Sequence, residues 1–500
     1  MLNGLYDSKK NYKNLIGGDW LFATDNANLK IFSPIDGSLI GTVPAMSCED
    51  IDYAMNFAKK SQNLWQETPM YMRAEYLYRA ADLLKEYKQV ISHVITMEIA
   101  KDKVSAESEV ERTVDFLRYT ADIGKSLEGT SVYGENFPGG SRDKLSYITR
   151  EPLGTVLAIS PFNYPVNLSV SKIAPALMGG NTVVLKPPSQ GGISALYLAL
   201  VFKEAGLPDG VLNTVTGSGS EIGDYLITHP NIDFINFTGS TAVGHHIAKT
   251  CGMIPIMLEL GGKDAAIILD DCNLDYAAEQ CVAGAFSYSG QRCTAVKRIL
   301  VIESIADQFV ALLKEKTLKL KSGSPHEDVS IVPLINDKSA DYVFGLIENA
   351  VAKGAEVITG GTRNDKLISP TVLDYVTTDM EVAWEEPFGP ILPIIRVKNI
   401  DEAISIANRS EYGLQSSVFT SDIGKAFTIA RKLEVGTVQI NNKTERGPDH
   451  FPFLGVKSSG MGTQGIKYSI EAMTRHKAIV VNLAEIFKSA LSFNIIFYCK

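Results

Sequence analysis

Short apolar runs that alternate with helical segments constrain the fold of this chain more than any other feature. Four such runs follow Gly154, and each is succeeded by turn residues and then by a helical segment. The runs are Thr155–Ser160, Thr182–Lys186, Val211–Thr216 and Phe234–Phe237. Strands that are apolar along their whole length are buried on both faces, and helices between them provide the crossovers of a parallel sheet. The sequence therefore predicts an α/β domain with a parallel sheet.

A second series of the same kind begins at Ala265–Leu269 and includes Val296–Ile302 and Thr437–Ile440. The chain has 500 residues, which is more than one hydrophobic core usually serves. We therefore predict a second α/β domain and place the boundary between the two series near Leu258–Gly262.

The segment before the first series is predicted to be mainly helical, over residues 47 to about 127. Ser47 precedes an acidic first turn, Glu49–Asp50, as a helix N-cap does. A Gly- and Pro-containing stretch, Tyr133–Gly140, ends the helical pattern. Polar and apolar residues then alternate along Lys144–Arg150, which predicts a strand or a hairpin.

Composition argues against several kinds of partner. The formal net charge is -9 and there is no long basic run, so we expect no nucleic acid. The N-terminus has no apolar stretch of the secretory type. The apolar C-terminal stretch Leu483–Tyr498 carries two charges and is shorter than the roughly 20 residues that span a bilayer. We therefore expect no membrane partner, and interpret that stretch as a packed or frayed tail.

The six cysteines and seven histidines bear on metals and on the compartment. There is no CxxC pair and no His/Cys ligand spacing, so we expect no metal site and no disulfide framework. This pattern favours a reducing compartment, and we expect the cytoplasm. Because the net charge is negative, an anionic substrate would require Arg and Lys side chains to be gathered at its binding site.

The segment Phe234–Gly244 is the first candidate site. A predicted strand runs into Thr238, Gly239 and Ser240, and a helix follows. Free amides at a helix N-terminus, together with the helix dipole, can hold phosphate oxygens. The segment is not G-x-G-x-x-G, because Thr241 stands where the second glycine would be. A tight strand–helix turn that binds nothing explains the pattern equally well.

Lys186–Pro187–Pro188–Ser189 is the second candidate site, at the end of a predicted strand. Ligands of open α/β sheets collect at the carboxyl ends of the strands. An NAD enzyme usually places an acid against the ribose 2′-hydroxyl, whereas this segment offers a cation and the neutral Ser189. That combination suits a 2′-phosphate. The alternative is a solvated surface lysine.

Three polar residues are candidates for chemistry. Cys293, within GQRCT, is flanked by glycine and polar residues, and we expect nearby cations or helix amides to favour its thiolate, although most cysteines are simply buried. Glu259, among Met, Leu and Gly, should have a pKa raised by desolvation, so that it could act as a base. Asn163, held between Pro161 and Pro165, could donate to an oxyanion. A buried, satisfied Glu and a turn-capping Asn are the alternatives.

Taken together, these segments resemble the aldehyde dehydrogenase superfamily. The motifs are PFNYP at 161–165, FTGST at 237–241, LELGGKD at 258–264, GQRCT at 290–294 and EEPFGP at 385–390, and the similarity covers roughly residues 10 to 481. SPFNYPVNLSVSKIAPAL, SYSGQRCTAVKR and NNKTERGPDHFPFLG are more similar still to members that oxidise glyceraldehyde 3-phosphate with NADP and water. The alternative is another small anionic aldehyde, such as a semialdehyde.

The resemblance implies an α/β architecture with three parts. These would be a Rossmann-like NADP-binding domain (1–128 and 150–258), a catalytic α/β domain (259–460) and a small β hairpin with the C-terminal segment for oligomerisation (129–149 and 461–500). It also implies a homotetramer.

Roles follow for particular residues. Cys293 would be the nucleophile, Asn163 with the Cys293 amide would form the oxyanion hole, and Glu259 would activate water. The residues implied for NADP are Ser160, Lys186, Ser189, Asp224, Gly239, Ser240, Glu386 and Phe388. Those implied for the substrate and its phosphate are Arg112, Tyr164, Arg292, Thr294 and Arg446. Guanidinium groups form charge-assisted bonds to phosphate, whereas a single surface arginine is more often a weak salt bridge. Ser189 stands where related proteins often have Thr, so discrimination against NAD could be softer.

Overall fold

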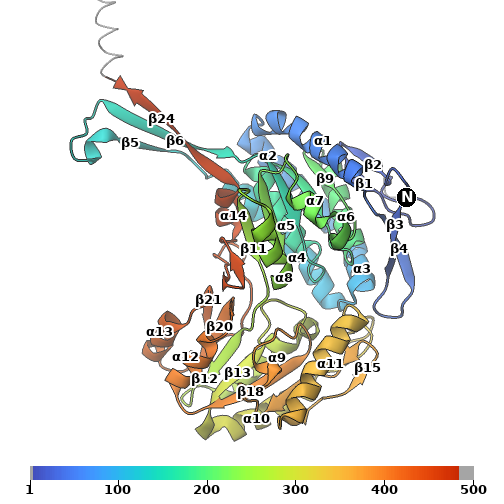
Figure 1. The fold of residues 1–500 in the computed structure, drawn as a ribbon, viewed down its shortest axis with the longest axis vertical. Helices are drawn as coiled ribbons and strands as arrows, with labels where there is room; N and C mark the ends of the chain where they lie inside the picture. Colours follow the sequence, from blue (N-terminus) through green and yellow to red (C-terminus); the bar gives the residue numbers. More distant parts are fainter. Residues whose placement is uncertain (1–3, 484–500) are drawn as a thin grey trace, which may run out of the picture.

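The structure is a computed structural model that describes residues 4–483. It consists of two α/β domains and a narrow β arm that projects from the first of them (Figure 1). The predicted α/β class is confirmed. The C-terminal stretch from residue 484 onward, for which a packed or frayed tail was expected, lies outside the described residues.

The first sheet has six strands in the order β23-β11-β10-β7-β8-β9. Its strands are β7 (Thr155–Ile159), β8 (Thr182–Lys186), β9 (Leu212–Thr214), β10 (Phe234–Thr238), β11 (Ile256–Glu259) and β23 (Gly460–Met461). Strands β7 to β11 are parallel. Four of them, β7 to β10, correspond to the predicted apolar runs, whereas β11 was not predicted. The sixth, β23, is antiparallel to β11 and pairs Gly460 with Glu259. A segment from the far end of the sequence therefore completes this sheet beside a candidate site residue.

Helices cover both faces of this sheet. They are α1 (Cys48–Gln66), α2 (Met70–Glu86), α3 (Lys88–Ile99), α4 (Lys103–Gly124), α5 (Asn167–Met178), α6 (Gly192–Glu204), α7 (Gly219–Ile227) and α8 (Thr241–Thr250). The predicted start of α1 is confirmed, because Ser47 and Asp50 form a reciprocal capping box. Two short hairpins precede α1: β1 (Asn14–Ile16) with β2 (Asp19–Leu21), and β3 (Asn28–Phe32) with β4 (Leu39–Pro44).

The second sheet has seven strands in the order β14-β17-β18-β13-β12-β20-β21. They are β12 (Ala265–Ile268), β13 (Arg298–Ile302), β14 (Glu356–Thr359), β17 (Thr371–Asp374), β18 (Ile391–Val397), β20 (Gln415–Phe419) and β21 (Thr437–Ile440). Its main helices are α9 (Leu274–Phe286), α10 (Glu303–Thr317), α11 (Asp337–Ala352), α12 (Ile400–Asn408) and α13 (Ile423–Lys432). All strands but β14 are parallel. The chain passes from the first sheet to the second over residues 260–264.

The arm is a three-stranded antiparallel sheet in the order β24-β6-β5. Its strands are β5 (Thr130–Tyr133), β6 (Lys144–Pro152) and β24 (Thr474–Asn482). The strand predicted at residues 144–150 is thus confirmed. Helix α14 (Ile466–Ala472) precedes β24 and packs on α4 and α5 of the first domain. Residues 461–483 are therefore divided between the first sheet, its helical layer and the arm.

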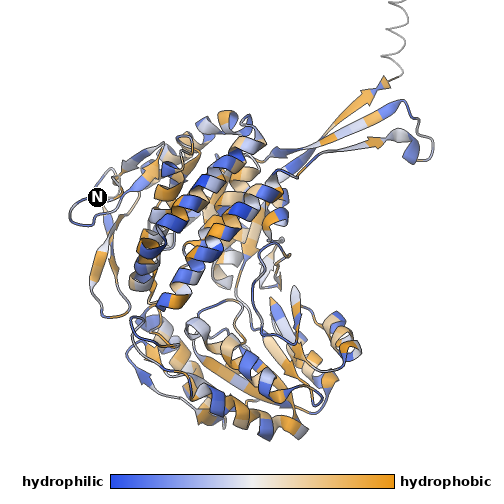
Figure 2. Ribbon diagram, turned by 180° about the vertical axis from the view of Figure 1, so that it is seen from behind, coloured by the Kyte–Doolittle hydropathy of each residue, from blue (hydrophilic) through white to orange (hydrophobic). Residues whose placement is uncertain are grey.

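The core follows from this layering. Helix α5 is buried along its whole length, and nearly all of α6 is buried. In Figure 2 the strands of the second sheet are mostly hydrophobic, whereas the outer helices alternate hydrophilic and hydrophobic residues. Burial of continuous apolar strands between two helical layers is what fixes the positions of the strand ends, where the candidate residues lie. No helix within residues 4–483 is both long and apolar enough to cross a membrane.

Candidate active site

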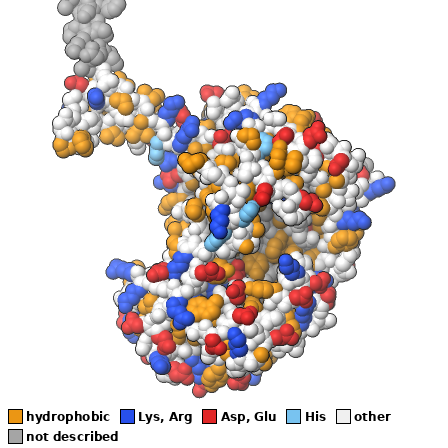
Figure 3. All heavy atoms as spheres, viewed as in Figure 1, with side chains coloured by type: hydrophobic (Ala, Val, Ile, Leu, Met, Phe, Trp, Pro, Cys, Tyr) orange, Lys and Arg blue, Asp and Glu red, His pale blue; other side chains and the backbone are white. Residues whose placement is uncertain are grey.

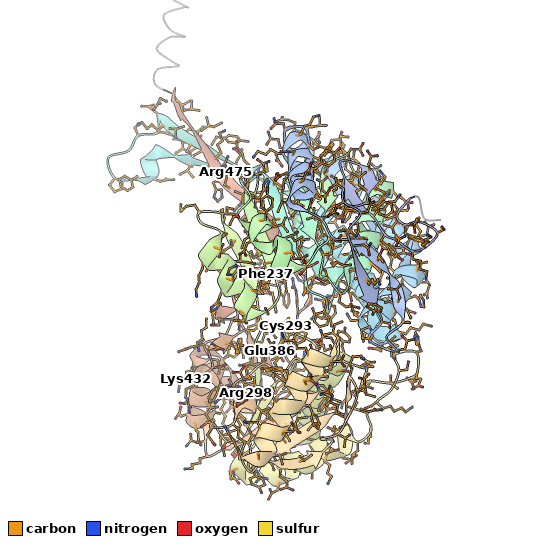
Figure 4. The ribbon with its side chains drawn as sticks, turned by 45° about the vertical axis from the view of Figure 1, so that its right-hand side comes forward. Phe237, Cys293, Arg298, Glu386, Lys432 and Arg475 are labelled. Atoms are coloured by element: carbon orange, nitrogen blue, oxygen red, sulfur yellow. The ribbon has the colours of Figure 1, made fainter. Side chains whose placement is uncertain are left out.

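The carboxyl ends of parallel strands bring the candidate residues to one edge of the first sheet. Strands β7, β8, β10 and β11 end at Ile159, Lys186, Thr238 and Glu259. The molecular surface is hollowed between the two α/β domains (Figure 3). In Figure 4, Cys293 and Glu386 lie together where the domains meet, with Phe237 of β10 above them. The structure therefore places the candidate nucleophile at the ligand-binding edge of the first sheet.

The loop that carries Cys293 is held in a strained conformation. Tyr288, Ser289 and Gly290 all have left-handed backbones, with φ of 51°, 52° and 71°. Such conformations cost free energy in residues other than glycine, and they persist only where the surroundings impose them. Ser289 supplies one such constraint: its Oγ donates to the Val332 carbonyl and accepts from the Val332 amide, both at 2.8 Å. The loop that carries Cys293 is therefore anchored to the backbone of Val332.

The Cys293 thiol is more weakly acidic than expected. Burial is the largest influence and raises its pKa to about 11, and the carboxyl groups of Glu259 and Glu386 act in the same direction. The charges of Lys297 and Arg446 lower it, but by less. The expectation that neighbouring cations would favour the thiolate is thus wrong, because desolvation of the Cys293 thiol outweighs their charges.

Asn163 lies against the loop that carries Cys293. Its Nδ2 donates to the Gln291 carbonyl oxygen at 3.0 Å, two residues before Cys293. Its own carbonyl oxygen accepts from the buried ammonium of Lys101 at 2.6 Å. The side chain is 3% exposed. Since an amide nitrogen has two hydrogens, Asn163 can hold Gln291 and still offer a second donor.

Glu259 ends strand β11, and its pKa is shifted as the sequence predicted. The residue is 4% exposed, and burial raises the pKa of its carboxyl group to about 7. The charges of Arg446 and Lys172 oppose that rise. A carboxyl group with a pKa near neutrality can be a carboxylate, and hence a base, at physiological pH.

Lys172, on α5, belongs to this cluster although the sequence reasoning missed it. It is buried, and its Nζ donates to Thr238 Oγ1 at 2.7 Å and to the Leu168 carbonyl oxygen at 3.3 Å. Burial is the main cause that lowers its pKa to about 7, and repulsion from Arg446 adds to it. The available signal was a single lysine within the otherwise uncharged helix NLSVSKIAPALM.

Two of the three predicted phosphate-binding arginines converge. Arg112, on α4, donates from Nε and Nη2 to both carboxylate oxygens of Asp449 at 2.7 Å, and Nη2 also donates to the Arg446 carbonyl at 3.0 Å. Arg446 Nε lies 3.6 Å from Asp449, and its Nη2 donates to Gln464 Oε1 at 2.8 Å. Arg446 and Asp449 line a cavity of about 290 Å³. Asp449 was not predicted.

The other residues predicted to bind the substrate are Arg292 and Thr294, which flank Cys293, and Tyr164, which contacts Lys101. Arg292 donates from Nη2 to the Gly284 carbonyl, and its Nε is a buried donor with no hydrogen-bond partner among the described residues. Within residues 4–483, Arg292 forms no hydrogen bond or ion pair with Asp449. The ring of Tyr164 stacks over the Lys101 ammonium, 3.6 Å from the ring centroid. Thr294 is buried, and its carbonyl accepts from Thr444 Oγ1 at 3.0 Å.

Lys186 is buried rather than solvated, which removes the surface alternative for this residue. Its side chain donates to the Pro187 carbonyl oxygen at 3.0 Å, and burial lowers the pKa of its ammonium group to about 8. No salt bridge to Lys186 is present among residues 4–483. Ser189, three residues later, is exposed. Ser160 is buried at the end of β7 and accepts from Ser169 Oγ at 2.8 Å.

The turn between β10 and α8 presents a helix N-terminus. Ser240 is the N-cap of α8, and its Oγ accepts from the Val243 amide at 3.4 Å. A Cβ at position 239 would lie 2.4 Å from the Phe237 ring, so glycine is the residue that fits here without moving that ring. Asp224, on α7, is exposed and pairs with His246 of α8 at 2.7 Å.

Glu386 is held by an unpredicted partner. Its Oε1 accepts from the ammonium of Lys297 and, at 3.1 Å, from the Gly262 amide. The same Lys297 ammonium donates to the Cys293 carbonyl oxygen. Phe388 has a left-handed backbone with φ of 46°, and its ring meets Phe162 edge to face at 5.8 Å. The structure thus brings Glu386 and Phe388 to the same junction as Cys293.

With this geometry in place, comparison with known proteins assigns the class. The chain belongs to the aldehyde dehydrogenase family, whose model matches residues 20–479. The NADP-dependent glyceraldehyde-3-phosphate dehydrogenase of Streptococcus equinus is 55% identical over 95% of this chain and 100% of its own length. The enzyme of the same name from Pisum sativum is 48% identical over 94% of this chain and 95% of its own length.

A solved structure agrees with the sequence comparison. NADP-dependent glyceraldehyde-3-phosphate dehydrogenase from Bacillus halodurans C-125, in complex with NADP, superimposes with a TM-score of 0.94. It is 53% identical, and the match covers 95% of this chain and 99% of that one. The three-part architecture described above is therefore that of an aldehyde dehydrogenase.

Proposed function

We propose that this protein oxidises D-glyceraldehyde 3-phosphate to 3-phosphoglycerate, using NADP and water. The observation that carries the proposal is a cluster of ionisable groups beside the ends of β10 and β11. The charges of Arg446 and Lys172 lower the pKa of the Glu259 carboxyl group. The charges of Glu259 and Arg446 in turn shift the pKa of the Cys293 thiol in opposite directions. Relatives that share about half of the sequence are named for this substrate and cofactor.

The first chemical step forms a covalent adduct. The Cys293 sulfur attacks the aldehyde carbon, and the thiol proton is released to solvent water. The resulting oxyanion accepts hydrogen bonds from the Asn163 side chain and the Cys293 amide. The protonated form of Lys172, whose pKa is lowered to about 7 by burial, would add positive charge close to this centre. When bound, NADP supplies the nicotinamide that accepts the hydride, which converts the thiohemiacetal into a thioester.

The second step releases the acid. Glu259 removes a proton from a water molecule, and the hydroxide attacks the thioester carbon. The carbon–sulfur bond breaks, which frees the acid and restores the Cys293 thiol. Because the pKa of Glu259 is about 7, a large fraction of its carboxyl groups can take up that proton at neutral pH.

Substrate choice would rest on the basic residues at the domain junction. We assign the substrate phosphate to Arg112, Tyr164, Arg292 and Arg446, with Thr294 beside the reacting group. Charge-assisted, forked hydrogen bonds from guanidinium suit a phosphate dianion. Arg446 is 11% exposed and faces a cavity, so an anion there would be partly desolvated and its binding strengthened.

The cofactor site fits NADP on two observations. Lys186 is a buried cation whose charge is not balanced by a carboxylate among the described residues, so a phosphate there would offset its desolvation. The N-terminus of α8, capped by Ser240, would hold the pyrophosphate, with Gly239 allowing a close approach, although the Gly239 amide itself donates to the Glu259 carbonyl oxygen at 3.1 Å. Ser189 and Asp224 would border the adenosine ribose, Ser160 would lie at the strand end, and Glu386 with Phe388 would hold the nicotinamide end.

The finer organisation is also part of the proposal. The NADP-binding domain would comprise 1–128 and 150–258, the catalytic domain 259–460, and the oligomerisation segment 129–149 with 461–500. Apolar side chains on the arm, including Val132, Phe137 and Val480, are exposed and could be covered in a homotetramer. The five described cysteines are free thiols, which suits the cytoplasm.

The first test is an assay without inorganic phosphate or coenzyme A. Glyceraldehyde 3-phosphate and NADP should yield NADPH and 3-phosphoglycerate, with no acyl phosphate. An absolute requirement for either omitted acceptor would sink the proposal. Comparing kcat/KM for succinic semialdehyde in the wild type and in Arg446→Ala tests substrate class. Arg446→Ala should lower kcat/KM for the phosphorylated aldehyde far more than for the semialdehyde.

The second test separates the two chemical steps. Cys293→Ala should form no thioester. Glu259→Ala should release about one equivalent of NADPH per site in a burst and then turn over slowly, because acylation does not require the base. If Glu259→Ala showed no burst, the assigned role of this carboxylate would be wrong.

A further inference from the structure

A fully buried ammonium group outside the set of reacting residues connects the parts of the active site. Lys101 lies in the turn between α3, whose C-cap residue Ala100 has a left-handed backbone, and α4, which is capped by Asp102. Its side chain is 0% exposed, as is that of its ion-pair partner Glu109. Burying two charges costs free energy unless every hydrogen-bonding position is satisfied. A buried pair of this kind is therefore expected to serve the fold or the site through its contacts.

The contacts of Lys101 are directed at the loop that carries Asn163. The ammonium donates to Glu109 Oε2 and to the Asn163 carbonyl oxygen, both at 2.6 Å. It also lies 3.6 Å from the ring centroid of Tyr164 and 4.7 Å from that of Tyr288. A cation that is enclosed by aromatic faces and two oxygens is strongly localised, and so are the groups that enclose it.

Glu109 fixes the other end of the same loop. Its Oε1 accepts from the amides of Val166 and Asn167, at 2.9 and 3.1 Å, where α5 begins. One carboxylate therefore holds the start of α5 with one oxygen and Lys101 with the other. The backbone from Asn163 to Asn167 is clamped at both ends by a single ion pair.

The clamp reaches the loop that carries Cys293 as well. Tyr288, whose ring contacts Lys101, donates from its hydroxyl to the Ile99 carbonyl at 3.0 Å. Asn163 donates to the Gln291 carbonyl at 3.0 Å. Both contacts join a segment of the first domain to the loop that ends at Cys293. The reaction requires the Asn163 loop and the Cys293 loop to keep their relative positions, because a shift of about 1 Å in a reacting group can cost roughly a hundredfold in rate.

We propose that Lys101 is a positioning residue that sets the Asn163 side chain against the Cys293 loop. The inference rests on the proposed function only in that Asn163 donates to the oxyanion formed at Cys293. The competing explanation is that the Lys101–Glu109 pair serves the stability of the fold alone.

The test is a double-mutant cycle with an uncharged aldehyde, propanal, and NADP. Removing Lys101 alone would leave Glu109 as an unpaired buried charge, which strongly destabilises a protein. The paired variant Lys101→Met/Glu109→Gln removes both charges and keeps an oxygen for the α5 amides. It is compared with Asn163→Ala and with the combination of all three substitutions. Each kcat is measured well below the melting temperature of that variant.

If Lys101 acts through Asn163, the paired variant should lose at least tenfold in kcat, and adding Asn163→Ala should cost less than a further twofold. If the loss of kcat in the combined variant equalled the product of the losses in the paired variant and in Asn163→Ala, the inference would be wrong, since independent effects are additive in free energy. So would a paired variant that retained kcat within twofold, or one that failed to fold while Lys101→Met alone folded and was fully active.

Arg73→Met is the matched control. Arg73 caps α5 at its other end, donating to the Met178 carbonyl at 2.8 Å, so its loss should lower stability while leaving kcat within twofold. A wild-type protein that oxidised no aldehyde with NADP would sink the proposed function and this inference together. An active wild type with a multiplicative cycle would sink this inference alone.

Discussion

Arg112 and Asp449 form a two-point ion pair, in which Nε and Nη2 of the guanidinium each donate to one carboxylate oxygen at 2.7 Å. The pair joins α4 of the first domain to the loop that carries Arg446, separated by more than three hundred residues in the sequence. Burial alone would raise the pKa of Asp449, but the hydrogen bonds and charge of Arg112 and the charge of Arg446 hold it below its ordinary value. Asp449 is therefore the resting counterion of two proposed phosphate ligands.

Asp449→Ala should make the stability of the protein depend on anions. Losing one partner of this partly buried pair should lower the free energy of unfolding by roughly 1–3 kcal/mol. An anion that enters between Arg112 and Arg446 would replace the carboxylate, so inorganic phosphate should raise the melting temperature of the variant more than that of the wild type. Thermal unfolding in phosphate and in chloride at equal ionic strength measures this.

Asp271→Ala provides the control for that experiment. Asp271 accepts from Thr420 Oγ1 at 2.7 Å and pairs with Lys425 rather than with an arginine. Its loss should lower the melting temperature equally in both salts. An equal response of Asp449→Ala to phosphate and to chloride would contradict the assigned anion site.

Glu259→Gln should stabilise the protein above neutral pH. The pKa of Glu259 in the folded protein, about 7, lies above its ordinary value of 4.5, so the folded state holds the proton more tightly than the unfolded chain does. The contribution of Glu259 to the free energy of unfolding is fully present below about pH 4.5 and is lost as the pH rises through about 7. The loss amounts to about 3 kcal/mol.

Urea unfolding of the wild type and Glu259→Gln at pH 5 and pH 8 measures that difference. The variant should be more stable by a few kcal/mol at pH 8, with a smaller gain at pH 5. A variant that was less stable than the wild type at pH 8 would mean that the carboxylate is better solvated or paired than its burial implies.

The fold was largely predictable because its main signals are local. Strands β7, β8 and β12 lie within continuous apolar runs of the sequence, and Ser47 caps the helix that follows it. The strand β23 gave no such signal. It has two residues and exists because it pairs with β11, about two hundred positions earlier. Pairing over that distance is decided by tertiary packing, which no short window of sequence contains.

The site was predictable in its motifs but not in its electrostatics. Cys293, Glu259 and Asn163 stand in recognisable segments, whereas Asp449, Lys172 and Lys101 matter through what they touch. The raised pKa of Glu259 followed from its apolar neighbours in the sequence. The raised pKa of Cys293 did not, because polar neighbours in the sequence coexist with burial between two domains. Desolvation is a property of the folded surroundings and overrode the local pattern.

Lys186→Ala should change the preference between NADP and NAD. A buried ammonium group that binds a 2′-phosphate contributes a charge-assisted bond of about 1.5–3 kcal/mol. Its loss should lower kcat/KM for NADP by roughly ten- to a hundredfold, with little change for NAD. Ser189→Ala, which removes only a neutral hydroxyl, should show a smaller loss in the same direction. A parallel fall with both cofactors would contradict the assignment of Lys186 to the 2′-phosphate.

Gly261→Ala should disable the site through Glu386 without unfolding the protein. A Cβ at Gly261 would lie 2.1 Å from Glu386 Oε2, and the carboxylate cannot simply rotate away, because its Oε1 is held by Lys297 and by the Gly262 amide. We expect Glu386 to be displaced from the proposed nicotinamide ribose contact and kcat to fall about tenfold or more, the cost of misplacing a positioning group. Gly345→Ala on α11 is the matched control, since a Cβ there meets no atom within 4 Å. If Gly261→Ala kept the wild-type kcat and NADP affinity, Glu386 would have no part in holding the cofactor.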